Sequence, residues 1–360
     1  MYKTHTCGEL RQENVNQEIS LAGWVHNIRT FGGVVFLVLR DRFGITQVVT
    51  APGTHLETAQ QIASLKNEWV VKVTGVVRAR PADQVNPAMP TGAIEVEAHS
   101  LVVLNPAKPM PFVVSRDDEF VDENIRLKYR YLDLRRERMK RNLVLRHEVV
   151  LFMRNYLSDK GFIEVETPVL IKSTPEGARD YVVPSRLAQG KFYALPQSPQ
   201  QYKQLLMVGG IEKYFQIARC FRDEDSRGDR QPEFTQLDFE MSFPTQEEIL
   251  SIIEKLYIDL VKKITPEKHI AQIPFPRITY KEVMEKYKSD KPDLRKNKED
   301  KNELAFGFVV DFPAFEWKET EKRWDAVHHP FTKTQNQDKL EEKEFIEKIK
   351  KNPEKFMAHQ

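Results

Sequence analysis

Short apolar runs bounded by glycine and proline mark the first hundred residues of the chain. Runs rich in β-branched and aromatic residues predict five strands, at Leu21–His26, Val34–Arg40, Thr46–Thr50, Trp69–Val77 and Ile94–Val103. Helical spacing over Thr54–Leu65 predicts one helix between the third and fourth strands. This order predicts a small Greek-key barrel of the OB type over residues 1–105. The pattern alone favours a barrel with a purely structural role.

The pattern changes to helical spacing from Asn142 onward. One face of a helix that ends at Lys160-Gly161 then carries the apolar residues Leu145, Val149, Phe152, Met153 and Tyr156. Strand candidates follow among further helices, at Phe162–Glu166, Phe192–Leu195, Tyr214–Cys220 and Thr235–Phe243. The mixture predicts an α+β domain over residues 143–360, with an antiparallel sheet flanked by helices. Residues 296–303 form a charged bridge, and the Lys/Glu-rich segment 333–356 is predicted to be helical.

A connector over residues 106–142 separates the two predicted domains. It opens with three prolines that resist regular structure and continues into the densest basic segment, Asn124–Arg138. Acidic neighbours such as Asp133 and Glu137 can pair with arginines at helical spacing, which favours a solvated helix face. A hinge beside the phosphates of a nucleic acid is the alternative.

Composition narrows the classes of function. Hydrophobic residues make up 40% of the chain and charged residues 30%, which is typical of a globular protein with a charge-rich surface. The formal net charge is only +2, so a nucleic-acid partner would have to be held by local basic patches. Cys7 and Cys220 lie far apart and outside any Cys/His cluster, which argues against disulfides or structural zinc and for a reducing cytosol. With no leader-like or membrane-length apolar run, we expect a cytoplasmic protein.

The segment Phe221–Glu240 carries the most informative candidate chemistry. A strand ends near Arg222, a loop of alternating charges follows, and a second strand returns with apolar residues among polar ones. Two antiparallel strands would bring Arg222, Glu224, Gln236 and Asp238 to one open face, which suits a substrate with both a phosphate and an ammonium group. A surface hairpin with solvated ion pairs fits the same pattern.

Three further segments offer polar groups. Pro196–Lys203 reads either as a capped helix or as a helix start that holds a carboxylate, with Gln200 and the final lysine on one face. Thr174–Tyr181 has the glycine, proline and charge of a lid, or of a plain connecting loop. The adjacent His328 and His329 point in different directions and lack a partner cluster, so a polar role in a pocket is favoured over metal binding.

These segments occur together and in order in one family, the bacterial type of aspartyl-tRNA synthetases within class II. Gly161–Pro168 resembles motif 1 of the class II enzymes, the dimer-interface element that ends in a fixed proline, and Phe221–Glu240 resembles motif 2. Ser173–Tyr181 is similar to the flipping loop of the aspartyl enzymes, and Gln197–Lys203 to the start of their amino-acid-recognition helix. The anticodon-binding barrel of this subclass is matched by Gly23-Trp24, Phe36, Arg40-Asp41-Arg42, Gly44 and Gln47.

The resemblance implies an ATP site and an anticodon site. Arg222 would be the catalytic residue that holds the α-phosphate, Glu224 would contact the adenine edge, and Phe234 would stack on the adenine ring. The ATP site would be completed by Asp223 and Gln231. In the barrel, an unpaired anticodon base would be read by stacking, hydrogen bonding and positive charge from Phe36, Gln47 and Arg29.

The resemblance also implies an aspartate site and a homodimer. Lys203 would pair with the side-chain carboxylate of the substrate, and Glu176 would close over the bound amino acid. The amino end would be held by Gln200 and Asp238. The site would also include Ser198, Gln236, His328 and His329. Pro168 would lie at the dimer interface.

The implied reaction has two steps and uses ATP with Mg²⁺. The α-carboxylate of L-aspartate attacks the α-phosphorus of ATP to give aspartyl-adenylate and pyrophosphate, and the terminal ribose hydroxyl of tRNA(Asp) then attacks the activated carbonyl. Positioning and neutralisation of phosphate charge carry most of the first step. The residues leave open whether tRNA(Asn) is also charged.

The chain departs from the family in two places. The large insertion that bacterial members carry after motif 2 looks absent or replaced by the charged bridge at 296–303. The chain ends at Gln360, where a last strand and helix with motif 3 and the acidic Mg²⁺ ligands should follow. We therefore expect an exposed sheet edge and little activity. The alternatives are a non-catalytic tRNA-binding relative and an asparaginyl-tRNA synthetase.

Overall fold

The computed structural model describes residues 2–50, 55–174, 176–225, 228–329, 332–335 and 341–358. The chain divides into two compact units, Met1–Val144 and Leu145–Gln360. Among the helices of the described residues, none combines the length and the apolarity that crossing a bilayer requires.

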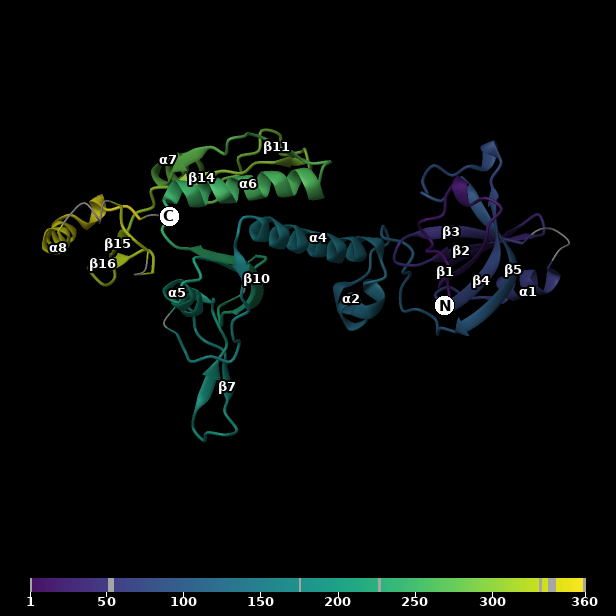
Figure 1. The fold of residues 1–360 in the computed structure, drawn as a ribbon, viewed down its shortest axis with the longest axis horizontal. Helices are drawn as coiled ribbons and strands as arrows, with labels where there is room; N and C mark the ends of the chain where they lie inside the picture. Colours follow the sequence, from purple (N-terminus) through teal and green to yellow (C-terminus); the bar gives the residue numbers. More distant parts are fainter. Residues whose placement is uncertain are drawn as a thin grey trace. The chain divides into compact units, whose positions relative to one another are not determined.

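The first unit contains a five-stranded barrel closed in the order β1-β2-β3-β5-β4 (Figure 1). Its elements are β1 (Glu18–Phe31), β2 (Val34–Arg40), β3 (Ile45–Val49), α1 (Leu56–Ser64), β4 (Val70–Ala79) and β5 (Ile94–Asn105). Neighbouring strands are antiparallel except for β3 and β5, which run parallel. The predicted barrel, with one helix between its third and fourth strands, is confirmed.

The alternation of side chains explains how the barrel fills its interior. The odd-numbered residues from Ile19 to Val25 of β1 are buried, while the even-numbered residues between them are more exposed. This is the pattern of a strand that turns one face to a core. Gly32 and Gly33 have φ of 56° and 79°, as a two-residue turn between β1 and β2 requires.

The basic connector is organised around one buried carboxylate. Asp133 is fully buried and accepts hydrogen bonds from Arg126 at 3.1 Å and Arg130 at 2.6 Å. These residues lie on the short helices α2 (Glu123–Lys128) and α3 (Arg130–Asp133). The expected pairing of Asp133 with an arginine at helical spacing is present, and the buried carboxylate also binds Arg126 of the preceding helix.

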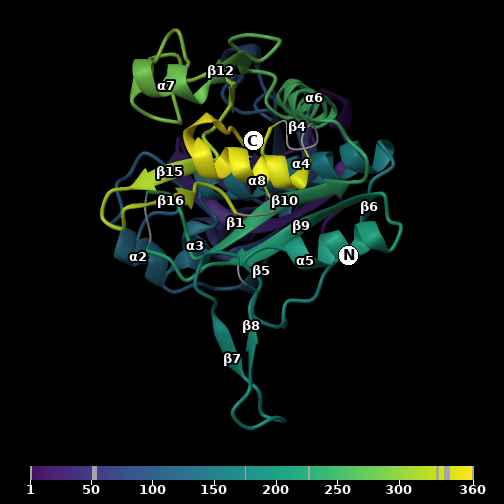
Figure 2. The same cartoon turned by 90° about the vertical axis from the view of Figure 1, so that its left-hand side faces the viewer.

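The second unit is built on a three-stranded sheet in the order β10-β9-β6. β9 (Lys213–Phe221) pairs antiparallel with β10 (Glu233–Met241) and parallel with the short β6 (Ile163–Glu164). Figure 2 shows α5 (Gln200–Val208) on one side of β9 and β10 and α6 (Gln246–Ile264) on the other. The predicted α+β class with an antiparallel strand pair flanked by helices is confirmed.

The remaining elements of this unit are small. Two-stranded pairs join β7 (Val182–Pro184) with β8 (Phe192–Ala194), β11 (His269–Ile270) with β13 (Glu303–Leu304), β12 (Arg277–Thr279) with β14 (Phe308–Val310), and β15 (Phe315–Lys318) with β16 (Arg323–Ala326). The helices are α7 (Tyr280–Tyr287) and α8 (Glu342–Lys351). The residues predicted as a charged bridge therefore end in a strand, and the helix predicted in the tail is shorter than expected.

Helix α4 (Glu137–Asp159) differs from its prediction in two respects. It begins before Asn142, because the preceding Glu-Arg-Met-Lys-Arg run consists of good helix formers. Leu157 belongs to the core of the sheet, together with Phe162 and Phe215, whereas Leu145 is 38% exposed. The predicted apolar face is therefore covered only toward the C-terminal end of the helix.

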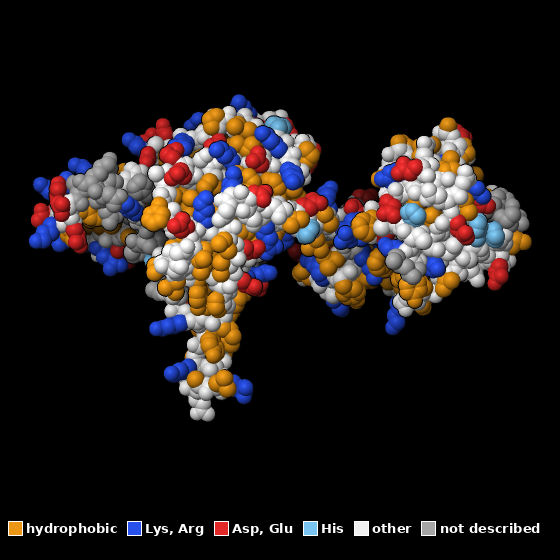
Figure 3. Space-filling model, in the orientation of Figure 1, with side chains coloured by type: hydrophobic (Ala, Val, Ile, Leu, Met, Phe, Trp, Pro, Cys, Tyr) orange, Lys and Arg blue, Asp and Glu red, His pale blue; other side chains and the backbone are white. Residues whose placement is uncertain are grey.

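The β7–β8 hairpin projects from the sheet of the second unit as an arm (Figures 1 and 2). Figure 3 shows hydrophobic side chains along this arm, of which Leu187 is 84% exposed and Phe192 59%.

Candidate functional site

The register of β9 and β10 assigns their even-numbered residues to one face of the sheet. Cys220 lies opposite Phe234, Ala218 opposite Gln236, and Gln216 opposite Asp238. The odd-numbered residues Phe215, Leu237 and Phe239 belong to the hydrophobic core on the other face. Because side chains alternate along a strand, Phe234, Gln236 and Asp238 form a row on the face away from that core.

Lys203 of α5 reaches this row. Its Nζ lies 2.8 Å from Asp238 and 3.2 Å from Glu240. The side chains of Lys203 and Asp238 are only 12% and 11% exposed. Burial alone would lower the pKa of Lys203, but the attraction of the two carboxylates outweighs it and the pKa lies above its ordinary value. Lys203 therefore stays a cation in this site.

One oxygen of Asp238 has no donor at hydrogen-bonding distance among the described residues. Its Oδ1 accepts the hydrogen bond from Lys203, while the buried Oδ2 is without such a donor. The nearby hydroxyl of Tyr214 donates to Gln216 at 2.9 Å, and burial followed by the charge of Asp238 raises the pKa of Tyr214. A buried carboxylate oxygen without a donor costs free energy, and it is therefore a suitable acceptor for a cationic or N–H group of a ligand.

A second part of the site surrounds Arg222, which directly follows β9. A cavity of about 1060 Å³ is lined by Arg222, Asp223, Glu224, Gln231 and Phe234, among other residues. The five predicted ATP-site residues are thus brought together. The guanidinium of Arg222 lies 5.2 Å from the centre of the Phe234 ring, a cation–π distance. Ser226 and Arg227 of the same segment lie outside the described residues.

Further arginines line this cavity that the sequence did not single out. They are Arg146, Arg179, Arg219 and Arg230. Arg146 donates to Thr235 at 2.8 Å, and Arg219 pairs with Glu233 at 3.0 Å. Together with Arg222 they make the cavity suitable for a polyphosphate. Arg179 and Arg230 lie within the loop 173–181 and the segment 221–240 noted from sequence, whereas Arg146 and Arg219 lie outside both.

Lys203, Gln200 and Asp238 are not among the residues that line the Arg222 cavity. The β10 face connects the two groups, since Arg222 contacts Phe234 and Lys203 contacts Asp238. The candidate ATP residues and the candidate aspartate residues therefore lie along one strand.

The loop before β7 and the start of α5 meet at Glu176. Its carboxylate accepts hydrogen bonds from Ser198 Oγ at 2.5 Å and Thr174 Oγ1 at 3.2 Å. Ser198 Oγ also accepts from the backbone N–H of Gln200 at 3.3 Å, at the first turn of α5. Glu176, Ser198 and Gln200 are therefore neighbours. Pro175 of this loop lies outside the described residues.

The two histidines have other neighbours. His328 contacts Phe312 edge-on, with ring centres 5.7 Å apart, and its buried Nε2 has no hydrogen-bond partner. Burial lowers the pKa of His328, so the neutral ring is favoured. The backbone oxygen of His329 accepts from Thr332 at 2.8 Å. Phe312 follows β14 in the chain, and Pro330 and Phe331 fall outside the described residues.

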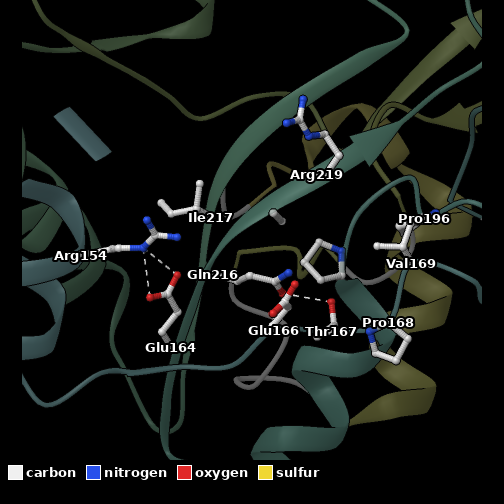
Figure 4. A pocket seen from close by; sticks show the side chains of 12 residues that line it. Arg154, Glu164, Glu166, Thr167, Pro168, Val169, Pro196, Gln216, Ile217 and Arg219 are labelled. Carbon is white, nitrogen blue, oxygen red and sulfur yellow. Dashed lines mark hydrogen bonds and ion pairs between the residues drawn. The ribbon is translucent and has the colours of Figure 1, made fainter. Parts of the chain in front are cut away.

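Pro168 lies at a smaller cavity of about 470 Å³ beside the open edge of β9 (Figure 4). Figure 4 shows Glu164 paired with Arg154 at 2.9 Å and Thr167 donating to Gln216 at 3.0 Å. The edge is open because β6 pairs only with Tyr214 and Phe215 of β9.

The three anticodon candidates meet on the barrel. Arg29 of β1 lies 5.1 Å from the centre of the Phe36 ring on β2 and donates to Gln47 Oε1 at 3.1 Å. Gln47 in turn donates to Glu95 at 2.8 Å, and Glu95 lies 3.7 Å from Arg80. Glu95 and Arg80 were missed from sequence, because their contacts depend on how β4 and β5 close the barrel.

Comparisons with known proteins agree with this geometry. The family "tRNA synthetases class II (D, K and N)" matches residues 122–354, and the family "OB-fold nucleic acid binding domain" matches residues 19–104. The aspartate–tRNA(Asp/Asn) ligase of Rubrobacter xylanophilus is 60% identical over 82% of this chain and 48% of its own length. The corresponding ligase of Dehalococcoides mccartyi is 42% identical over 92% of this chain and 77% of its own length.

The solved structures include the asparaginyl-tRNA synthetase of Pyrococcus horikoshii in complex with asparaginyl-adenylate. It matches with a TM-score of 0.70 and 26% identity, over 82% of this chain and 69% of that one. The chain spans about half the length of the Rubrobacter relative. The Dehalococcoides alignment runs over 465 residues, more than the 360 of this chain, so that relative carries segments absent here. By its family match and its relatives, this chain belongs to the class II tRNA synthetases of the D, K and N group.

Proposed function

We propose that the chain acts as an aspartate–tRNA ligase. It would activate L-aspartate with ATP to aspartyl-adenylate and transfer the aspartyl group to the 3′ end of tRNA(Asp). One observation carries the proposal: five residues suited to ATP line one cavity, which adjoins a face that holds Lys203 and Asp238. Two relatives named aspartate–tRNA(Asp/Asn) ligase support it.

In the activation step, the protein would mainly position ATP and neutralise its charge. Arg222 would hold the α-phosphate while the carboxylate of aspartate attacks in line and pyrophosphate leaves. Phe234 would stack on adenine beside Asp223, Glu224 and Gln231. Mg²⁺ would bind together with the nucleotide phosphates and help to neutralise their charge.

In the amino-acid site, Lys203 would select the acidic side chain. An ammonium group has three donors, and Asp238 and Glu240 occupy two of them. The third would bind the side-chain carboxylate of aspartate, while Oδ2 of Asp238 would accept the α-ammonium. Asparagine carries no side-chain charge, so it would pair less well with this buried cation.

Exchange of labelled pyrophosphate into ATP tests this function. We expect exchange that depends on aspartate, and a loss of about a hundredfold or more in Lys203→Met, because removing one positioned charge typically costs that much. Lys255→Met on the exposed side of α6 is the matched control and should behave like the parent.

Two outcomes would overturn the assignment. Exchange driven equally by asparagine would favour the asparaginyl alternative. No exchange with either amino acid, together with intact tRNA binding, would favour a non-catalytic tRNA-binding relative.

The tRNA partner is assigned to the barrel within the same proposal. Residues 1–105 would bind the anticodon through Phe36, Gln47 and Arg29, residues 106–142 would connect, and residues 143–360 would carry the chemistry. Charging assays with purified tRNA(Asp) and tRNA(Asn) would show whether one or both are accepted.

We also propose a homodimer that covers the region of Pro168. Val169 and Leu170 beside it are 44% and 54% exposed, and Leu151 of α4 is 46% exposed. Apolar side chains at such exposure are typical of an interaction surface. Sedimentation velocity should show a dimer that Leu170→Asp converts to a monomer, while Leu187→Asp on the β7–β8 arm should leave it intact. A monomeric parent would contradict the proposal.

A further inference from the structure

The loop that carries Glu176 is held by the side chain of Gln197. Gln197 is 1% exposed. Its Oε1 accepts from the N–H of Ala178 at 3.0 Å, and its Nε2 donates to the carbonyl of Ala178 at 2.9 Å. A carboxamide that pairs with both backbone groups of one residue replaces the two hydrogen bonds that a neighbouring strand would make.

Asp180 connects this pairing to the base of the loop. Its Oδ1 accepts from Gln197 Nε2 at 2.5 Å, and its Oδ2 accepts from Ser173 Oγ at 2.5 Å. Ser173 and Asp180 stand at the two ends of the segment that contains Glu176, so one carboxylate joins both ends of the loop to Gln197. The polar atoms of Gln197 and Asp180 are thereby satisfied only in this loop conformation.

The same residue also touches the phosphate side of the site. The backbone carbonyl of Gln197 accepts from Arg222 Nε at 3.4 Å. On the loop, the carbonyl of Arg179 accepts from the N–H of Asp223 at 3.0 Å. Gly177, Ala178 and Arg179 line the cavity that Arg222 also lines. Because the contact with Arg222 uses the backbone carbonyl of Gln197, replacing the Gln197 side chain leaves it in place.

We propose that Gln197 and Asp180 form a latch that holds Ser173 and residues 176–180 against the start of α5. Both are positioning residues: they touch the loop, and through it they place Glu176. The kinetic consequence rests on the proposed ligase function, whereas the effect on the loop does not. Opening the latch raises the KM for aspartate and leaves kcat at saturating aspartate nearly unchanged, because the loop then has to be ordered by the substrate.

Hydrogen–deuterium exchange of the 360-residue chain tests the latch without any substrate, because it measures how well the backbone amides of the loop are protected. In Gln197→Ala, the peptide that covers residues 176–181 should exchange faster, since the N–H of Ala178 loses its acceptor. Gln201→Ala removes the same side chain from an exposed position on α5 and serves as the matched control. Exchange in β9 and β10 should be unchanged in both variants.

Asp180 supplies a pair of variants that separates hydrogen bonding from folding. Asp180→Asn can still accept from Gln197 through its oxygen and donate to Ser173 through its nitrogen, so it should keep the loop protected. Asp180→Ala can do neither and should expose the loop. Because Asp180 is only partly buried, this pair carries the test if Gln197→Ala fails to fold.

Pyrophosphate exchange measured at a series of aspartate concentrations gives the effect of the latch on the KM for aspartate. Gln197→Ala and Asp180→Ala should each raise the KM for aspartate about tenfold to a hundredfold, as the loss of one or two hydrogen bonds predicts, with the KM for ATP within about twofold of the parent. Asp180→Asn should restore most of the parent value.

Two results would overturn the latch. One is loop exchange in Gln197→Ala and Asp180→Ala that equals that of the parent. The other is an equal rise in KM for aspartate and ATP, which would indicate a general structural role. If the parent shows no aspartate-dependent exchange at all, the proposed function fails, but the deuterium measurement still decides whether the latch exists.

Discussion

The barrel and the synthetase sheet of this chain differ in how many neighbours their strands have and in how deeply their side chains are buried. In the barrel every strand has two neighbours, and side chains such as Leu21 and Leu37 are fully buried. In the sheet of the second unit, β10 has β9 as its one strand neighbour among the described residues, and Leu237 is only half-buried. Among the described residues, the second edge of β10 therefore has no strand partner.

This difference extends to the two candidate sites. The barrel site lies on adjacent strands, where Arg29, Phe36 and Gln47 are held by the ladder itself. The candidate catalytic site depends on segments outside the sheet, because Lys203 comes from α5 and Glu176 from a loop. A site on paired strands is positioned by backbone hydrogen bonds, whereas a site assembled from loops needs side-chain contacts to hold it.

The largest effect is expected at Arg222. Arg222→Ala should lower aspartate-dependent pyrophosphate exchange by about 10² to 10³, as the loss of a preorganised charge at the reacting phosphate predicts. RNA binding by the barrel should remain unchanged. Arg186→Ala on the connection between β7 and β8 is the control and should retain parent activity. Parent-level exchange in Arg222→Ala would remove this residue from the site.

A core substitution in the barrel comes next. Leu37→Ala should lower the free energy of unfolding of the barrel by about 3 kcal/mol, because Leu37 is fully buried. In a background with Trp317→Phe and Trp324→Phe, the remaining tryptophans, Trp24 and Trp69, both report on the first unit. Urea unfolding followed by their fluorescence measures the effect.

The matched change in the second unit is Leu187→Ala, measured in a background with Trp24→Phe and Trp69→Phe, in which Trp317 and Trp324 report on that unit. Leu187 is 84% exposed, so its truncation should change stability by less than about 0.5 kcal/mol. Equal losses for Leu37→Ala and Leu187→Ala would contradict the contrast between a closed barrel and an open sheet.

Replacing Phe36, the candidate stacking residue of the barrel, should have a smaller effect that is confined to RNA binding. Phe36→Ala should weaken binding of tRNA(Asp) by about 1 to 3 kcal/mol, the usual contribution of one base–aromatic stack. Binding should weaken further as salt is raised, since phosphates release counterions. Phe120→Ala, which removes a ring that is 90% exposed in the connector, is the control for nonspecific loss. Equal affinity of Phe36→Ala and parent in filter binding would remove the anticodon role.

The smallest effect concerns pH. Burial, followed by the charge of Arg40, lowers the pKa of His26 below its ordinary value of 6.5, and Arg40 donates to His26 Nδ1 at 3.0 Å. The folded barrel therefore binds fewer protons than the unfolded chain. Its stability should be full above pH 6.5 and should fall as the pH drops toward the lowered pKa.

Urea midpoints between pH 7.5 and about 5 measure this dependence. His26→Gln should flatten the profile, while His147→Gln on the exposed part of α4 should not. A parent profile that is flat over this range would contradict the assignment.

The local sequence pattern predicted the secondary-structure elements well, but it predicted fewer of the side-chain contacts. The pairing of Arg130 with Asp133 was predictable from their helical spacing, but Arg126 reaches the same carboxylate from a different helix. Gln197 and Asp180 were visible only as polar residues in two separate segments. The contact of His328 with Phe312 was likewise not apparent from the sequence. In each case the partner depends on how the chain folds back.

The sequence by itself determined the barrel, the strand pair that carries Arg222 and Asp238, and the family, because strand periodicity and short motifs are properties of neighbouring residues. Only the tertiary structure decided which charged groups meet. The ion pair of Lys203 with Asp238, the pairing of Gln197 with Ala178, and the arginines of the ATP cavity join segments far apart in the chain. Such contacts depend on chain reversals and packing, which no local spacing encodes.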